Sequence, residues 1–251
     1  MSQTSYSIDM EIAQVGLKAD TGFDNVLSYR AQEEMGFGLG LVQGAADSDA
    51  LLPSQNVGVL SFDADFVSDN DISLDVNGET VGPVSFDTDQ ATTLEALKDA
   101  INALDKITAG VTDTREITIT SREGALTVEN ISVTGGGSQA NGSISYSAAA
   151  DFIGVSAATH AIEQNKNNVA KKAATETVSV LTRGRIYVYT EQDVTVQDSV
   201  YLRSVSGGSD EKRGQFRKDD DGGNAFLVSG ARFLKDASAG GITIVEVNLP
   251  N

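Results

Sequence analysis

The chain has 251 residues, which is enough for one large domain or for two small ones that each bury a hydrophobic core. Its 36 acidic and 18 basic residues give a net charge of −18, which disfavours non-specific nucleic-acid binding because such binding needs a basic face. Cysteine is absent, so disulfides, thiolate metal sites and cysteine nucleophiles are excluded. The sequence holds no run of 18 apolar residues and no recognisable secretory signal, so we predict no membrane association.

The N-terminal region is polar, with one short alternating stretch at residues 6–12 that predicts a strand. We expect residues 1–20 to act as an arm that folds over a neighbouring molecule. In residues 35–44, apolar side chains alternate with Gly36, Gly38 and Gly40, a pattern that indicates close backbone approach or tight bends. A phosphate-binding loop is disfavoured because the P-loop spacing of glycine and lysine is missing.

Residues 56–150 have the pattern of a compact module of strands with one helix. Runs at 72–76 and 81–86 flank Asn77-Gly78, a favoured hairpin turn. Further short runs at 116–120, 125–129, 131–133 and 143–146 predict three or four more strands. This part of the chain is therefore predicted to be a small α+β domain.

Helical spacing is clear once, where Leu94, Leu97, Ile101 and Leu104 recur at i, i+3, i+7 and i+10. The pattern predicts a helix over residues 92–104, with Thr92 or Thr93 as its N-cap.

The same block holds more than half of the net charge. It carries 15 acidic and 4 basic residues, whereas the other 156 residues carry 21 acidic and 14 basic ones. This asymmetry predicts an independently folded, solvent-facing unit. A calcium site is the alternative for its closely spaced aspartates and for the acidic turn 219–222, but the EF-hand pattern is missing and a solvated acidic rim is favoured. The aspartates are Asp63, Asp65, Asp69, Asp71 and Asp75.

Residues 151–251 contain six or more short strands with closely spaced turn signals, which is typical of a β-sandwich or barrel. The most regular stretch is 178–203, where two short runs are separated by Thr182-Arg183-Gly184-Arg185 and a third run follows a polar link. We predict a mainly β fold: residues 1–55 and 151–251 form one discontinuous β-sandwich or barrel-like domain, and 56–150 form an inserted α+β domain.

Catalytic candidates are few. His160 is the only histidine, which excludes a two-histidine zinc motif, and no G-x-S-x-G nucleophile elbow occurs. Carboxylate pairs for glycoside hydrolysis are available in so acidic a chain, but tryptophan is absent and the six tyrosines are scattered. We therefore predict neither enzymatic activity nor a cofactor.

Basic residues concentrate in the last third of the chain, which suggests a contact face for an acidic partner; ordinary mixed surface charge is the alternative. Arg183 and Arg185 are the strongest candidates, because a charged turn between two strands is expected to be exposed. The candidate capsid or oligomer contacts discussed below are Arg183, Arg185, Arg203, Arg217 and Arg232.

Eight short motifs occur in a fixed order: DNVLSYR (24–30), GFGLGLVQG (36–44), GVSAATHAIEQ (154–164), TVSVLTRGRIYV (177–188), DSVYLR (198–203), GQFRKD (214–219), GARFL (230–234) and AGGITIVEV (239–247). This series resembles the structural cement (capsid decoration) proteins of tailed bacteriophages. The resemblance covers residues 17–55 and 151–251, and the block 56–150 departs from the family pattern.

The resemblance implies a β-rich virion protein that lies on the outer surface of the capsid and bridges capsomers. Its implied partners are the major capsid protein and further copies of itself, as dimers or trimers, and it brings no active site. The alternative is a virion surface or tail protein whose inserted module binds a receptor or host glycan. Copy number separates the two, because a cement protein is about as abundant as the major capsid protein.

Overall fold

A computed structural model of the protein describes residues 14–20, 22, 24–122, 124–136, 140–148, 151–158, 171–207 and 211–249. The chain divides into two compact units. We call residues 1–53 with 150–251 the discontinuous unit, and residues 54–149 the inserted unit. The predicted fold class is confirmed: strands dominate, and the inserted unit adds a helix. No helix in the described part of the chain has the length and apolar character of a membrane span.

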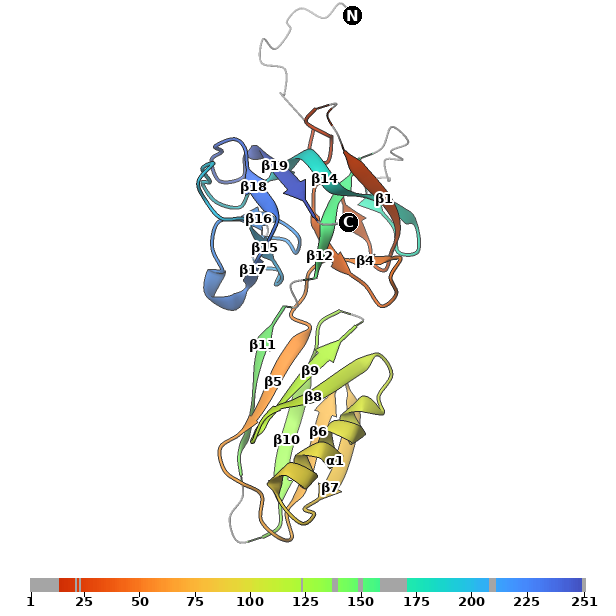
Figure 1. The fold of residues 1–251 in the computed structure, drawn as a ribbon, viewed down its shortest axis with the longest axis vertical. Coiled ribbons are helices and arrows are strands. Elements are labelled where there is room, and N and C mark those ends of the chain that lie inside the picture. Colours follow the sequence, from red (N-terminus) through yellow and green to blue (C-terminus); the bar gives the residue numbers. More distant parts are fainter. Residues whose placement is uncertain are drawn as a thin grey trace, which may run out of the picture. The chain divides into compact units, whose positions relative to one another are not determined.

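Five strands of the discontinuous unit close into a small barrel (Figure 1). The ring runs β1–β4–β3–β12–β14, and β14 then pairs with β1. Only the contact between β1 and β4 is parallel. The barrel encloses a small core that includes Met35, Leu41, Val178 and Val180. The strands are β1 (Asn25–Ala31), β3 (Gly40–Gln43), β4 (Asp49–Leu51), β12 (Phe152–Ala157) and β14 (Thr177–Tyr189), and a two-stranded ribbon of β2 (Met35–Gly36) and β13 (Lys171–Lys172) accompanies them.

The second half of β14 leaves the barrel and pairs with β19 (Ile242–Asn248), which in turn pairs with β18 (Ala231–Phe233). A second sheet has the order β16 (Phe216–Arg217), β15 (Tyr201–Arg203) and β17 (Ala225–Leu227). Buried side chains of both sheets form one cluster, which includes Ile186, Val188, Leu202, Phe216, Phe233 and Val245. Strand β14 therefore contributes to two cores.

The continuity of β14 corrects one prediction. Arg183, Gly184 and Arg185 do not form a turn between two strands, because β14 runs through them without interruption. Gly184 has a φ of +132°, a conformation that side chains rarely adopt, and the strand passes from its β1 partners to its β19 partners at this point.

Gly38 and Gly40 lie where backbone and side chains approach closely, as predicted, whereas Gly36 does not. A Cβ atom at Gly40 would lie 2.3 Å from Leu202 Cδ1. Gly38 combines a φ of +69° with a similarly close approach to Val15. At Gly38 the segment around Val15 and Gly16 lies next to β14, because Tyr187 O is also within 3.2 Å of the added Cβ position.

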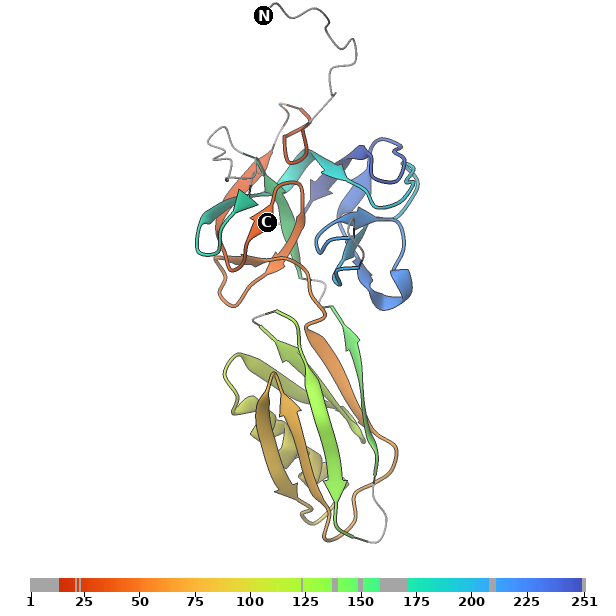
Figure 2. The same cartoon turned by 180° about the vertical axis from the view of Figure 1, so that it is seen from behind.

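The inserted unit contains two antiparallel sheets, ordered β10–β6–β7 and β11–β5–β9–β8 (Figures 1 and 2). Helix α1 packs against β7 and β8, and the core lies between the sheets and the helix. The core includes Leu60, Ile72, Leu74, Leu97, Ile117 and Ile119. The elements are β5 (Val57–Phe62), β6 (Asp71–Val76), β7 (Glu79–Ser85), α1 (Gln90–Asn102), β8 (Ile107–Asp113), β9 (Glu116–Ser121), β10 (Val128–Thr134) and β11 (Gly142–Ser147).

The predicted hairpin at Asn77-Gly78 is confirmed, since both residues have positive φ and join β6 to β7. The predicted N-cap is wrong. Helix α1 begins at Gln90, and the side chain of Asp89 accepts a hydrogen bond from the Thr92 amide at 2.8 Å. Strands β5 and β8 were not predicted. His160 and residues 6–12 lie outside the described residues.

Candidate functional site

The five candidate arginines separate into two groups. Arg183, Arg185 and Arg232 are on the surface, where β14, β18 and β19 meet. Arg203 and Arg217 lie in β15 and β16 and are only 2% and 3% exposed. In both groups, strand pairing places arginines that are far apart in the sequence close together.

Glu246 is the centre of the surface group. The pairing of β19 with both neighbours places Arg185 and Arg232 on either side of it. Arg185 Nε donates to Glu246 Oε1 at 3.0 Å, and Arg232 Nε donates to Oε2 at 2.6 Å. A second carboxylate joins, since Arg185 Nη1 also donates to Asp20 Oδ2 at 3.1 Å. Partial burial raises the pKa of Glu246, but the hydrogen bonds from the two arginines outweigh it and hold this pKa below its ordinary value.

Arg183 is exposed and makes no ion pair with any described residue. It borders a surface hollow of about 360 Å³ that Asp20, Arg185 and Glu246 also line. Two carboxylates balance the charge of Arg185, whereas no carboxylate of the described residues pairs with Arg183. Within the part of the chain that the structure describes, Arg183 is therefore the arginine of this group whose charge is free to meet a partner.

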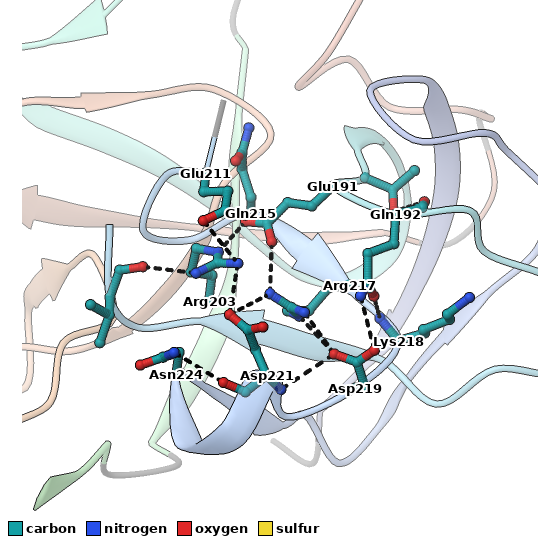
Figure 3. Close-up of polar contacts among 12 residues, drawn as sticks. Glu191, Gln192, Arg203, Glu211, Gln215, Arg217, Lys218, Asp219, Asp221 and Asn224 are labelled. Carbon is teal, nitrogen blue, oxygen red and sulfur yellow. Dashed lines mark hydrogen bonds and ion pairs between the residues drawn. The ribbon is translucent and has the colours of Figure 1, made fainter. Parts of the chain in front are cut away.

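Arg203 and Arg217 enclose a buried carboxylate, Glu191 (Figure 3). Arg203 Nε donates to Glu191 Oε1 at 2.6 Å, and Arg217 contacts Oε2 at 3.1 Å. All three side chains are at most 4% exposed. Burial raises the pKa of Glu191, and the hydrogen bond from Arg203 offsets part of this rise.

The acidic turn at residues 219–222 and Glu211, whose Oε2 lies 3.5 Å from Arg203, supply further counter-charge. Asp221 Oδ2 lies 3.0 Å from both Arg203 and Arg217, and Asp219 Oδ1 lies 2.7 Å from Arg217 (Figure 3). Asp219 is oriented further by Gln192, whose amide donates to its Oδ2 at 2.9 Å. The turn therefore binds the chain's own guanidinium groups.

This arrangement corrects the expectation for Arg203 and Arg217 as surface contacts. Each adjoins a buried apolar residue in a short strand, Leu202 and Phe216 respectively, and both faces of these strands are covered. Glu191 was missed because it lies in a polar link, and its burial arises only when three distant segments meet. The sequence signal for this cluster was that β15 and β16 each end in an arginine, Arg203 and Arg217, directly after an apolar residue.

The five aspartates of the inserted unit do not converge. Asp63 accepts from Asn141, Asp65 pairs with Arg115, and Asp75 accepts from Thr80 and Asn130. Asp71 accepts from Ser85. Within the described ranges, no group of three or more acidic, cysteine or histidine side chains is placed to hold a metal ion.

Comparisons with known proteins relate the chain to structural proteins of phages. The model of the family described as structural cement protein (E217 gp24/Pam3 gp6) matches residues 99–248, more than half of the chain. The match includes residues 99–149, so the expectation that the whole block 56–150 departs from the family is wrong. The match does not include residues 17–55, where a resemblance was also expected. No curated protein matches the sequence.

Among solved structures, a chain described as the capsid of Myoviridae phage XM1 is similar, with 9% sequence identity and a TM-score of 0.51. The alignment covers 98% of this chain and 97% of the phage XM1 chain. At this identity the similarity concerns the fold alone. Because the family model matches residues 99–248, more than half of the chain, this chain belongs to the structural cement protein family of phages.

Proposed function

We propose that the protein binds the outer surface of a phage capsid and bridges neighbouring capsomers, which stabilises the shell. The observation that carries this proposal is membership of the structural cement family over residues 99–248. The major capsid protein and further copies of this chain, as dimers or trimers, are the partners we propose. Since a cement protein binds the assembled lattice and not the free subunits, each occupied site shifts the equilibrium toward the intact shell.

The surface around Glu246 is the contact face that we propose for the capsid. It combines two compensated arginines, Arg185 and Arg232, with the uncompensated Arg183. In a chain of net charge −18, such a local basic face would orient the protein toward an acidic patch. Arg203 and Arg217 are left out of this face because their charges are satisfied internally.

The inserted unit, on this proposal, faces solvent. It carries the larger share of the net negative charge, and mutual repulsion between neighbouring copies favours a position away from the crowded shell.

Charge reversal at Arg183 tests the contact face. Arg183→Glu leaves the Arg185–Glu246–Arg232 group in place, because Arg183 has no ion-pair partner among the described residues. We expect about tenfold weaker binding to purified capsids, equivalent to about 1.4 kcal/mol, measured by co-sedimentation at low ionic strength. The difference from the unmodified protein should shrink as salt is added, because salt screens exposed charges.

Arg122→Glu is the matched control, since Arg122 is an exposed arginine of the inserted unit and the change in net charge is identical. It should leave capsid occupancy unchanged. Equal losses for both variants would show a general charge effect, and no loss for Arg183→Glu would remove this surface from the contact.

A further inference from the structure

Strand pairing places no carboxylate opposite Arg183. Its partner on β1 is Asn25, and its partner on β19 is Asn248. Two residues further along β14, Arg185 instead lies opposite Glu246 and forms an ion pair with it. Seven of the nine arginines in this acidic chain pair with a carboxylate of the described residues, so the two asparagines beside Arg183 set it apart.

The carboxylates nearest to Arg183 are already bound by other cations. Two of them line the surface hollow and a third lies beside Gly184, and each forms an ion pair with a lysine or with a different arginine. This set contains four cations and three carboxylates, so one positive charge is in excess. Its members are Lys18, Arg183, Arg185, Arg232, Asp20, Asp24 and Glu246.

The excess charge borders an open space of suitable size. The hollow of about 360 Å³ has Arg183 and Asn248 among its lining residues, and ligand pockets in proteins span ~300–1,000 Å³. A guanidinium group binds a carboxylate through two parallel N–H···O hydrogen bonds. The side-chain amide of Asn248 is a further donor at the same hollow. These groups together fit a carboxylate.

A single carboxylate suits the hollow better than a phosphate chain or a nucleic acid. The net charge of −18 opposes the approach of a polyanion, and Asp20 and Glu246 add negative charge at the hollow itself. One carboxylate needs one compensating charge, which is the charge that Arg183 supplies.

We infer that the hollow receives the carboxylate of one aspartate or glutamate side chain of the major capsid protein, which Arg183 binds through two of its guanidinium nitrogens. This inference rests on the proposed function, because the capsid supplies the side chain. It adds a requirement that the contact face alone does not have. A basic face needs only a positive charge, whereas a carboxylate held in the hollow needs the planar guanidinium group.

Arg183→Lys separates the two, since lysine keeps the charge and removes the planar pair of donors. We expect binding to purified capsids to weaken about fivefold at physiological ionic strength, where lysine replaces two hydrogen bonds with a point charge. Unchanged binding of Arg183→Lys, together with a loss for Arg183→Glu, would overturn the inference and leave the contact face in place. A wild-type protein that does not bind capsids would overturn both.

Asn248→Asp provides a second test, in which Arg183 itself is kept. The new carboxylate lies opposite Arg183, in the same relation as Glu246 to Arg185, and supplies an internal counter-ion. We expect capsid binding to weaken at least as much as in Arg183→Lys. Asn248→Ser, which adds no charge, should bind as the wild type does, and equal binding of the two Asn248 variants would contradict the inference.

Ser143→Asp is the charge control for Asn248→Asp, because Ser143 is an exposed residue of the inserted unit and the change in net charge is identical. It should leave capsid binding unchanged. An equal loss for Ser143→Asp would show that net charge, and not the hollow, determines binding.

Acetate is the probe for a measurement without capsids. The full-length protein is titrated with sodium acetate, and with sodium chloride at the same ionic strength, while NMR follows the Arg183 Nε–H signal, which is assigned by its absence in Arg183→Lys. We expect a saturable shift with acetate only, and none in Asn248→Asp. The same unsaturated response to both salts would overturn the hollow as a carboxylate site.

Discussion

At the scale of single residues, the most consequential side chain is Glu191. It is the shared counter-ion of two buried arginines, and its own burial raises its pKa. A buried ion pair adds little net stability compared with an apolar core, but removing one partner leaves the other charge without compensation. Here the loss of Glu191 would leave the two guanidinium groups dependent on Glu211, Asp219 and Asp221 at the edge of the cluster.

Glu191→Ala should therefore lower the free energy of unfolding by about 3–5 kcal/mol, measured by urea denaturation of the full-length protein. Glu34→Ala is the matched control, because Glu34 forms an ion pair with Lys171 in which its side chain stays 58% exposed. That change should cost no more than about 1 kcal/mol. A loss below 1 kcal/mol for Glu191→Ala would show that the buried cluster is not a stabilising element.

Individual residues were the least predictable part of the molecule. Arg183 and Arg185 were expected to be exposed, and they are, but as strand residues and not as a turn. Arg203 and Arg217 look the same as the surface arginines in the sequence, because nothing local records that Glu191 meets them from a third segment. Burial of a charge is a property of tertiary contact, and local alternation carries no information about it.

At the scale of elements, β14 organises the discontinuous unit. Its first half closes the barrel against β1 and β12, and its second half supports β19 and β18. The alternation of Val178, Val180, Ile186 and Val188 made the strand character predictable. Its continuity was not predictable, since a charged tripeptide around glycine has the pattern of a turn.

Closure of the barrel depends on a glycine opposite β14. Gly154 in β12 has a φ of +140°, and a Cβ atom there would lie 2.4 Å from Leu181 O. Gly154→Ala should destabilise the protein by about 1–3 kcal/mol, because the backbone is strained and β12 must move from β14. Thermal unfolding of the full-length protein measures the effect.

Gly36→Ala provides the comparison within the same unit. Gly36 has no positive φ, and an added Cβ would find its nearest neighbour, Leu39 Cδ1, at 3.6 Å. This variant should change stability by less than about 0.5 kcal/mol. Equal effects of the two substitutions would contradict a special role of Gly154 in closing the barrel.

At the scale of the whole molecule, the alternation of strands and the single helical period were sufficient to predict a mainly β chain with an α+β insertion. The helix was displaced by two residues, because the sequence offers both Asp89 and the threonines as N-caps and only the structure shows which oxygen accepts. Strands β5 and β8 were missed, although β5 does alternate in burial. The predicted extent of the family resemblance was wrong, since the family match begins at residue 99, inside the inserted unit.

The inserted unit has a core of its own, so we expect residues 54–149 to fold without the rest of the chain. Expressed alone, this fragment should show cooperative urea unfolding by circular dichroism. A non-cooperative, unfolded fragment would mean that the two units depend on each other.

The central claim is that this chain decorates and bridges the capsid. The most direct test is an electron cryomicroscopy map of the phage particle that carries the protein. The account predicts density for the discontinuous unit on the outer shell, in contact with at least two capsomers, in a copy number close to that of the major capsid protein. Density confined to a few copies at the tail, or located inside the shell, would contradict it.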